Sequence, residues 1–159
     1  MIVSAIVIGC SVTSDLLMRL APMVLFGDFP LFWKTLSSEA VQTDPPYSYS
    51  GYVVLDAITL LMNRGWGPIV DLSSPEASTL VDVDVGLVLC CKEKDANELL
   101  SFVRSVAFSD AELAASWREQ PFSKEWDEAV PALREAIAYI EKTLALLPKH
   151  GDWVLLFIT

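Results

Sequence analysis

The C-terminal stretch of the chain constrains its fold more than any other. Residues 153–158 (Trp-Val-Leu-Leu-Phe-Ile) are apolar without a break, which is typical of a strand that is buried on both faces. Residues 131–147 precede it and carry an apolar stripe with charged residues outside it, so they predict a long amphipathic helix. The stripe follows helical spacing: Leu133, Ile137, Ile140, Leu144 and Leu147. Because an apolar terminal strand must pair inside a sheet, we expect the last residues of the chain to lie in the core.

Similar patterns predict the remaining elements. Two further strands are expected at residues 2–8 and 86–91, and the alternation from Val81 to Val85 places Asp82 and Asp84 on one strand face. Helices are expected at residues 15–20, 30–36, 52–63, 95–107 and 110–119, the first ended by Pro22 and the fourth capped by Asp95. This order predicts a single α+β domain over residues 1–159, with a small mixed sheet, a helical remainder and a buried C-terminal strand.

The composition is unusually apolar for a soluble protein. Hydrophobic residues make up 53% of the 159 residues, and the mean hydropathy is +0.43. Either the core is large for the size of the chain, or part of the apolar surface meets a partner, which includes a second copy of the chain as a homodimer. No apolar run reaches the length that a membrane-spanning helix needs, so we expect no membrane partner.

The net charge of the chain limits the classes of partner that it can bind. The formal net charge is −10, and nucleic acid would be repelled because its recognition needs clustered Lys and Arg. A cationic protein would be attracted and steered toward such a surface. The alternative is that the surplus acid only keeps the protein soluble.

The cysteines predict a reducing compartment and no metal centre. Cys90 and Cys91 are adjacent within an apolar run, and Cys10 follows the first predicted strand. Buried free thiols in the cytoplasm explain this pattern. A metal site would need more ligands at ligand spacing, and the Asp82/Asp84 pair is better explained as a solvated strand face, because no further ligands lie nearby in the sequence.

The sequence carries no motif that indicates catalysis. It lacks a P-loop, G-x-G-x-x-G, G-x-S-x-G and H-E-x-x-H. His150 is the only histidine, and no nucleophile and orienting acid can be assigned to it. We therefore expect a protein that is not an enzyme and needs no cofactor.

Candidate contact residues combine acids with exposed aromatics. Residues 42–51 (QTDPPYSYSG) predict a loop that is either a binding surface rich in Tyr and Ser or a plain connector whose tyrosines lie on the core. Trp66 stands in a Gly-Trp-Gly turn and is either a partner anchor or a lid over the core. The predicted partner-binding residues are Asp44, Tyr47, Tyr49, Trp66, Trp126, Asp127 and Glu128.

The second half of the chain resembles a known family. The runs LCCKEKDANELLSFVRSVAFSDAELAASW and QPFSKEWDEAVPALREAIAYIEKTLALLPKHGDWVLLFI are similar to the YfbM-like family of small bacterial proteins, which have no assigned activity. The resemblance, mainly over residues 86–158, implies a strand, a helix, a short helix, a break at Pro121, a long helix, a turn at Gly151 and an apolar final strand. Residues 52–63 lack the Trp and the His that the family tends to place in its middle helix.

Small size, acidity, reduced cysteines and absent catalytic motifs together favour a binding protein. We expect a bacterial immunity or antitoxin-type inhibitor that neutralises a cognate protein toxin, basic in character, by direct contact. The alternative is a small enzyme or ligand-binding domain of unknown substrate, which a pocket with converging polar groups would favour.

Overall fold

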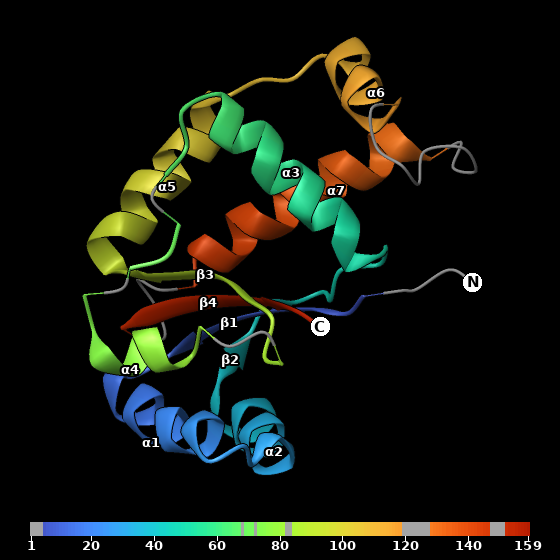
Figure 1. The fold of residues 1–159 in the computed structure, drawn as a ribbon. Helices are drawn as coiled ribbons and strands as arrows, with labels where there is room; N and C mark the ends of the chain where they lie inside the picture. The colour runs from blue at the N-terminus through green and yellow to red at the C-terminus, as the bar shows by residue number, and fades with distance from the viewer. Residues whose placement is uncertain (1–4, 68, 72, 82–83, 119–127, 147–151) are drawn as a thin grey trace.

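A four-stranded antiparallel sheet organises the protein. In the computed structural model, which describes residues 5–67, 69–71, 73–81, 84–118, 128–146 and 152–159, the strand order is β2-β1-β4-β3 (Figure 1). The strands are β1 (Val7–Val12), β2 (Val41–Gln42), β3 (Leu87–Lys92) and β4 (Trp153–Ile158). The C-terminal strand β4 pairs with β1 on one side and β3 on the other, so the prediction of a buried, central final strand is confirmed.

The sequence predicts a mixed sheet, but parallel pairing among the described residues is limited to one bridge. All pairs between the four strands are antiparallel. The only parallel bridge among the described residues joins Val70 to Cys90 outside the named strands. The α+β class is as predicted.

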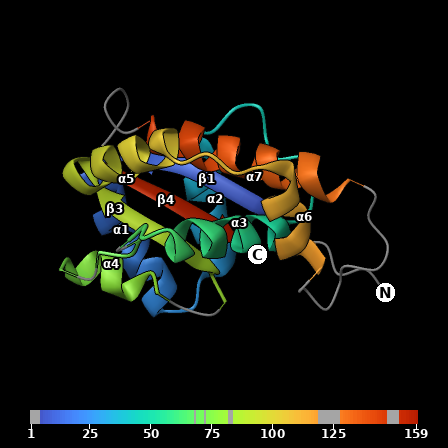
Figure 2. The ribbon, with the colours of Figure 1, turned by 90° about the horizontal axis from the view of Figure 1, so that it is seen from above.

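Helices cover both faces of the sheet. One face carries α3 (Gly51–Asn63), α5 (Glu93–Ser105) and α7 (Ala129–Leu144), with α6 (Asp110–Arg118) packed beyond them on α7 and α3. The other face carries α1 (Ser14–Leu25), α2 (Phe29–Glu39) and α4 (Pro75–Thr79). The two layers lie on opposite sides of the strands in Figure 1, and the first layer lies over them when seen from above in Figure 2.

The apolar run in β4 is explained by this arrangement. Successive side chains of a strand point to opposite faces. Val154 and Leu156 enter the core under α3, α5 and α7, whereas Trp153, Leu155 and Phe157 enter the core under α1, α2 and α4. Both faces of the central strand are therefore covered by helices, so every position along the strand needs an apolar side chain.

Two N-terminal boundaries differ from the prediction. The first strand begins at Val7 and not at residue 2; residues 1–4 lie outside the described part of the chain. The first helix continues through Pro22 to Leu25 and does not end at Leu20. Pro22 leaves the carbonyl of Met18 without its helical partner, and this loss is tolerated because Met18 is exposed while the apolar face continues to the buried Val24.

Two boundaries around β3 also differ. Residues 84–86 form a turn, so Asp84 does not lie on a strand face; Asp82 lies outside the described residues. Gly86 has a φ of +72°, and a Cβ there would lie 2.1 Å from the carbonyl oxygen of Ile158, so β3 can begin only after it. Helix α5 begins at Glu93, which places Asp95 in the first turn and not at the N-cap.

Candidate functional site

A buried polar cluster fixes α7 against the first strand. The backbone N–H of Gly9 donates to the Tyr139 hydroxyl at 2.8 Å. The hydroxyls of Thr43 and Thr143 lie 2.7 Å apart, and the Thr43 backbone N–H donates to the Gly9 carbonyl. A Cβ on Gly9 would lie 2.4 Å from the Thr143 Oγ1, so this close approach requires glycine. The cluster holds the start of the loop at residues 43–50 in place.

That loop then lies against the first turns of α7. The Tyr47 hydroxyl donates to the Ala132 carbonyl at 3.0 Å, and the Ser48 hydroxyl donates to the Glu135 carboxylate at 2.8 Å. The Tyr47 ring centroid lies 5.8 Å from that of Tyr139 and 5.9 Å from that of Tyr49. Tyr47 and Tyr49 are partly buried and pack against the core under α3, α5 and α7. This is the arrangement expected of a connector whose tyrosines lie on the core, and a role of the loop in binding stays a prediction.

The charges of three carboxylates act on these tyrosines. Burial raises the pKa of Tyr47, and the charges of Glu135 and Asp56 raise it further. Burial also raises the pKa of Tyr49, as do the charges of Glu128 and Glu135 and a hydrogen bond to Glu128. Burial raises the pKa of Asp56 to about 6. We call the set Tyr47, Tyr49, Asp56, Glu128 and Glu135 the acidic tyrosine face.

No cation neutralises this face among the described residues. Their five ion pairs join Arg19 to Asp15 and Glu39, Arg64 to Glu112, Arg104 to Glu141, and Arg134 to Asp110. Arg134 lies in the same helix as Glu135 but is held by Asp110 and the Phe108 carbonyl. The described part of the acidic tyrosine face therefore carries surplus negative charge, which favours a positively charged group nearby.

The structure brings together part of the predicted set of contact residues. Tyr47, Tyr49 and Glu128 meet on the acidic tyrosine face, and Asp44 is exposed in the same loop. Trp126 and Asp127 lie outside the described residues. Sequence reasoning missed Asp56 and Glu135, because each reads as an ordinary solvated position on a helix until the loop is folded over α3 and α7.

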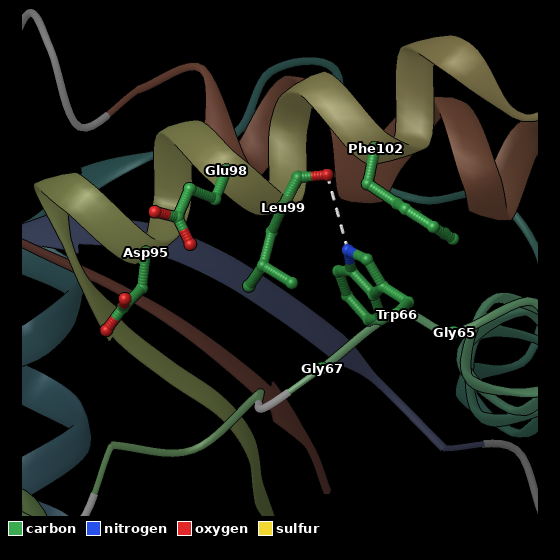
Figure 3. A pocket seen from close by; sticks show the side chains of 7 residues that line it. All are labelled: Gly65, Trp66, Gly67, Asp95, Glu98, Leu99 and Phe102. Carbon is green, nitrogen blue, oxygen red and sulfur yellow. Dashed lines mark hydrogen bonds between the residues drawn. The ribbon is translucent and has the colours of Figure 1, made fainter.

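Trp66 does not join that face. It lies beyond the other end of α3, and the 13 residues of this helix span roughly 20 Å. Its indole is only 3% exposed, and its N–H donates to the Leu99 carbonyl at 3.3 Å (Figure 3). The core covers nearly all of the Trp66 ring, which fits the interpretation of Trp66 as a lid over the core. Its role as a partner anchor stays a prediction.

The described residues do not supply a metal centre. They include no group of three or more His, Cys, Asp or Glu side chains that could hold an ion. Burial raises the pKa of the Cys10, Cys90 and Cys91 thiols to about 12, so these side chains stay protonated and are poor ligands. Chemistry at the acidic tyrosine face is thus that of hydrogen-bond acceptors, aromatic rings and negative charge.

Comparison with known proteins adds no assignment to this geometry. No protein-family model, curated protein or solved structure matches the chain. Among the helices of the described residues, none combines the length and the apolar character needed to cross a bilayer.

Proposed function

We propose that the chain is a non-catalytic inhibitor of the bacterial immunity or antitoxin type, which binds a basic protein toxin through the acidic tyrosine face. One observation carries this proposal: two tyrosines converge with three carboxylates that no described cation neutralises. Tyrosines are frequent anchors of protein interfaces, and a surplus of one charge steers the opposite charge toward it. Inhibition by direct contact needs only such a complementary surface.

Two further features support this proposal: the state of the cysteines and the order of the elements. The three described cysteines are free and buried, which suits a reducing cytoplasm. The elements β3, α5, α6, α7 and β4 follow one another in the order that the YfbM-like resemblance implies. We keep membership of that family as a proposal.

The first test is capture of a partner from the native host. The tagged full-length chain is incubated with lysate, and bound proteins are identified by mass spectrometry. We expect a basic protein whose toxic activity is lost on addition of the chain in stoichiometric amount. Capture of no protein partner would count heavily against the proposal.

The second test locates the binding surface with a matched pair of charge reversals. Glu128 and Glu93 are both exposed acids at helix N-termini, so Glu128→Lys and Glu93→Lys change the net charge and the helix-terminal electrostatics alike. We expect Glu128→Lys to weaken binding about tenfold or more, mainly through slower association, while Glu93→Lys has a much smaller effect. Equal effects of the two variants would show that the face is not the interface.

A further inference from the structure

An exposed apolar surface lies on α1 and α2. These two helices pack side by side, and the sheet separates them from α3 and α7 (Figure 1). Nine large apolar side chains among the described residues are exposed, and four of them fall between residues 18 and 31. We call these four the α1–α2 surface: Met18, Leu25, Phe26 and Leu31.

The local sequence brings these side chains together. Met18, Pro22 and Leu25 follow one another at spacings of four and three residues, so they form one stripe on the solvent side of α1. Phe26 is the C-cap of this helix, and its side chain is 83% exposed. The short turn after it leads directly into α2, whose first turn carries Leu31. An aromatic side chain that stays in water favours burial by a partner.

The charges of this surface differ from those of the whole chain. The formal net charge of the chain is −10, but the only charged residues between positions 16 and 36 are Arg19, Asp28 and Lys34. Arg19 is already held by two acids, Asp15 and Glu39. Two copies of the chain that met through acidic surfaces would repel each other. The α1–α2 surface avoids this repulsion, because residues 16–36 carry no surplus of acid.

The two remaining charges make the surface complementary to itself. Asp28 and Lys34 are both exposed, and neither forms an ion pair with a described residue. In an association about a twofold axis, each contact between residue i of one copy and residue j of the other occurs twice. One unpaired charge of each sign therefore supplies two symmetric ion pairs, and the occupant that this pattern fits is a second copy of the chain.

We propose that two copies of the chain associate through the α1–α2 surface about a twofold axis. Leu25 and Phe26 are buried between the copies, and Asp28 of each copy pairs with Lys34 of the other. Aromatic residues and Met are enriched at the centres of protein interfaces. The acidic tyrosine face belongs to the layer of α3 and α7, on the other side of the sheet, so both copies keep it free. The association does not depend on the inhibitor proposal.

A membrane surface suits these residues less well. Helices that lie in a membrane interface carry Lys and Arg on their polar face, which anionic lipids attract. Arg19 is the only basic residue of α1, and the chain as a whole is strongly acidic. Anionic lipids would therefore repel the chain, whereas a second copy matches both the apolar and the charged groups of the surface.

The first experiment is sedimentation velocity of the full-length chain at increasing concentration. We expect a reversible dimer, and we expect Phe26→Ser to weaken it about tenfold or more because the interface loses its aromatic anchor. Met62→Ser is the matched control, since Met62 is 50% exposed near the end of α3 in the opposite layer, and it should leave association unchanged. Urea unfolding at low concentration checks that Phe26→Ser keeps the stability of the single chain, as expected at so exposed a position.

The second experiment tests the pairing of charges by mixing two variants. Lys34→Glu alone places Glu against Asp28 in both symmetric contacts, and Asp28→Lys alone places Lys against Lys34, so each variant should dimerise about tenfold more weakly than the wild type. A mixture of the two restores an opposite pair at both contacts. We therefore expect the mixture to form a heterodimer with about the wild-type affinity.

Three outcomes would overturn the proposal. One is a chain that stays monomeric at every concentration; if it then sediments with phosphatidylcholine vesicles in a manner that depends on Phe26, the surface is a lipid-binding one. Another is a dimer that Phe26→Ser leaves unchanged, which would place the interface elsewhere. The last is a mixture of Lys34→Glu and Asp28→Lys chains that associates no better than either variant alone.

Discussion

Asp56 is a half-buried carboxylic acid on α3, and burial raises its pKa from 3.8 to about 6. Between these two pH values the Asp56 carboxyl ionises in the unfolded chain before it ionises in the folded protein. The free energy of unfolding therefore falls as the pH rises from about 4 to about 6. We predict that Asp56→Asn, which removes this ionisation, stabilises the fold by about 1 kcal/mol at neutral pH once its partial exposure is taken into account.

Urea unfolding of both proteins at neutral pH and at pH values near 4 measures this effect. The difference in unfolding free energy should shrink at the lower pH, where the wild-type carboxyl is protonated in the folded protein and only partly ionised in the unfolded chain. Asp44→Asn is the control, because Asp44 is exposed in the neighbouring loop and its replacement should change stability by less than about 0.5 kcal/mol. A gain that is the same at both pH values would contradict the argument.

Tyr139 is a second residue whose role can be tested alone. Its hydroxyl accepts the Gly9 N–H inside the core, and Tyr139→Phe leaves that backbone donor without a partner. We predict a loss of about 1–3 kcal/mol in unfolding free energy. Tyr47→Phe should cost less, because the Tyr47 hydroxyl donates to a helical carbonyl at a partly exposed position. Urea unfolding of both variants measures the two losses. A larger loss for Tyr47→Phe would contradict the stabilising role assigned to the buried hydrogen bond between Gly9 and Tyr139.

At the level of elements, β4 is the strand on which both cores depend. It pairs with β1 and β3, and five of its six residues are buried. Burial of each large apolar side chain contributes roughly 1.5–3 kcal/mol, and a whole domain is stable by only about 5–15 kcal/mol. We predict that deletion of residues 153–159 yields insoluble or unfolded protein. A truncated chain that melts cooperatively near the full-length temperature would show that β4 is peripheral.

The strand β3 makes a further prediction about its thiols. Cys90 faces the core under α1, α2 and α4, and Cys91 faces the core under α3, α5 and α7. Burial raises the pKa of each thiol to about 12, and the thiolate is the form that reacts. Iodoacetamide at mildly alkaline pH should label neither residue in the native protein, and both after denaturation. Rapid native labelling of both, measured by mass spectrometry, would contradict the burial of β3.

The whole molecule carries a formal net charge of −10, and this field should control association with a basic partner. Exposed charges farther apart than the Debye length, about 10 Å at 0.1 M salt, are screened. We predict that the association rate with the captured partner falls by about tenfold or more between low and high ionic strength, while dissociation changes less. Surface plasmon resonance at several salt concentrations measures both rates. An association rate that does not respond to salt would exclude steering by the acidic surface.

Patterns along the sequence were sufficient to predict the main helices and strands and which of their faces are buried. The unbroken apolar run of Trp153–Ile158 required a strand covered on both faces, and the helical stripe from Leu133 to Leu144 required a buried face on α7. These properties depend on neighbours within a few residues, so periodicity reports them. Boundaries were less secure, because Pro22 weakens a helix locally while buried Val24 extends it through tertiary contacts.

Only the tertiary structure decided which side chains share a site. Asp56 and Glu135 lie on different helices, and their common environment exists because the loop at residues 43–50 is pinned over α7 by Thr43 and Tyr47. The sequence around Trp66 does not distinguish an exposed aromatic anchor from a buried side chain, and packing between α3 and α5 buries it. Contacts between distant segments depend on shape and hydrogen bonding in three dimensions, which a one-dimensional pattern does not encode.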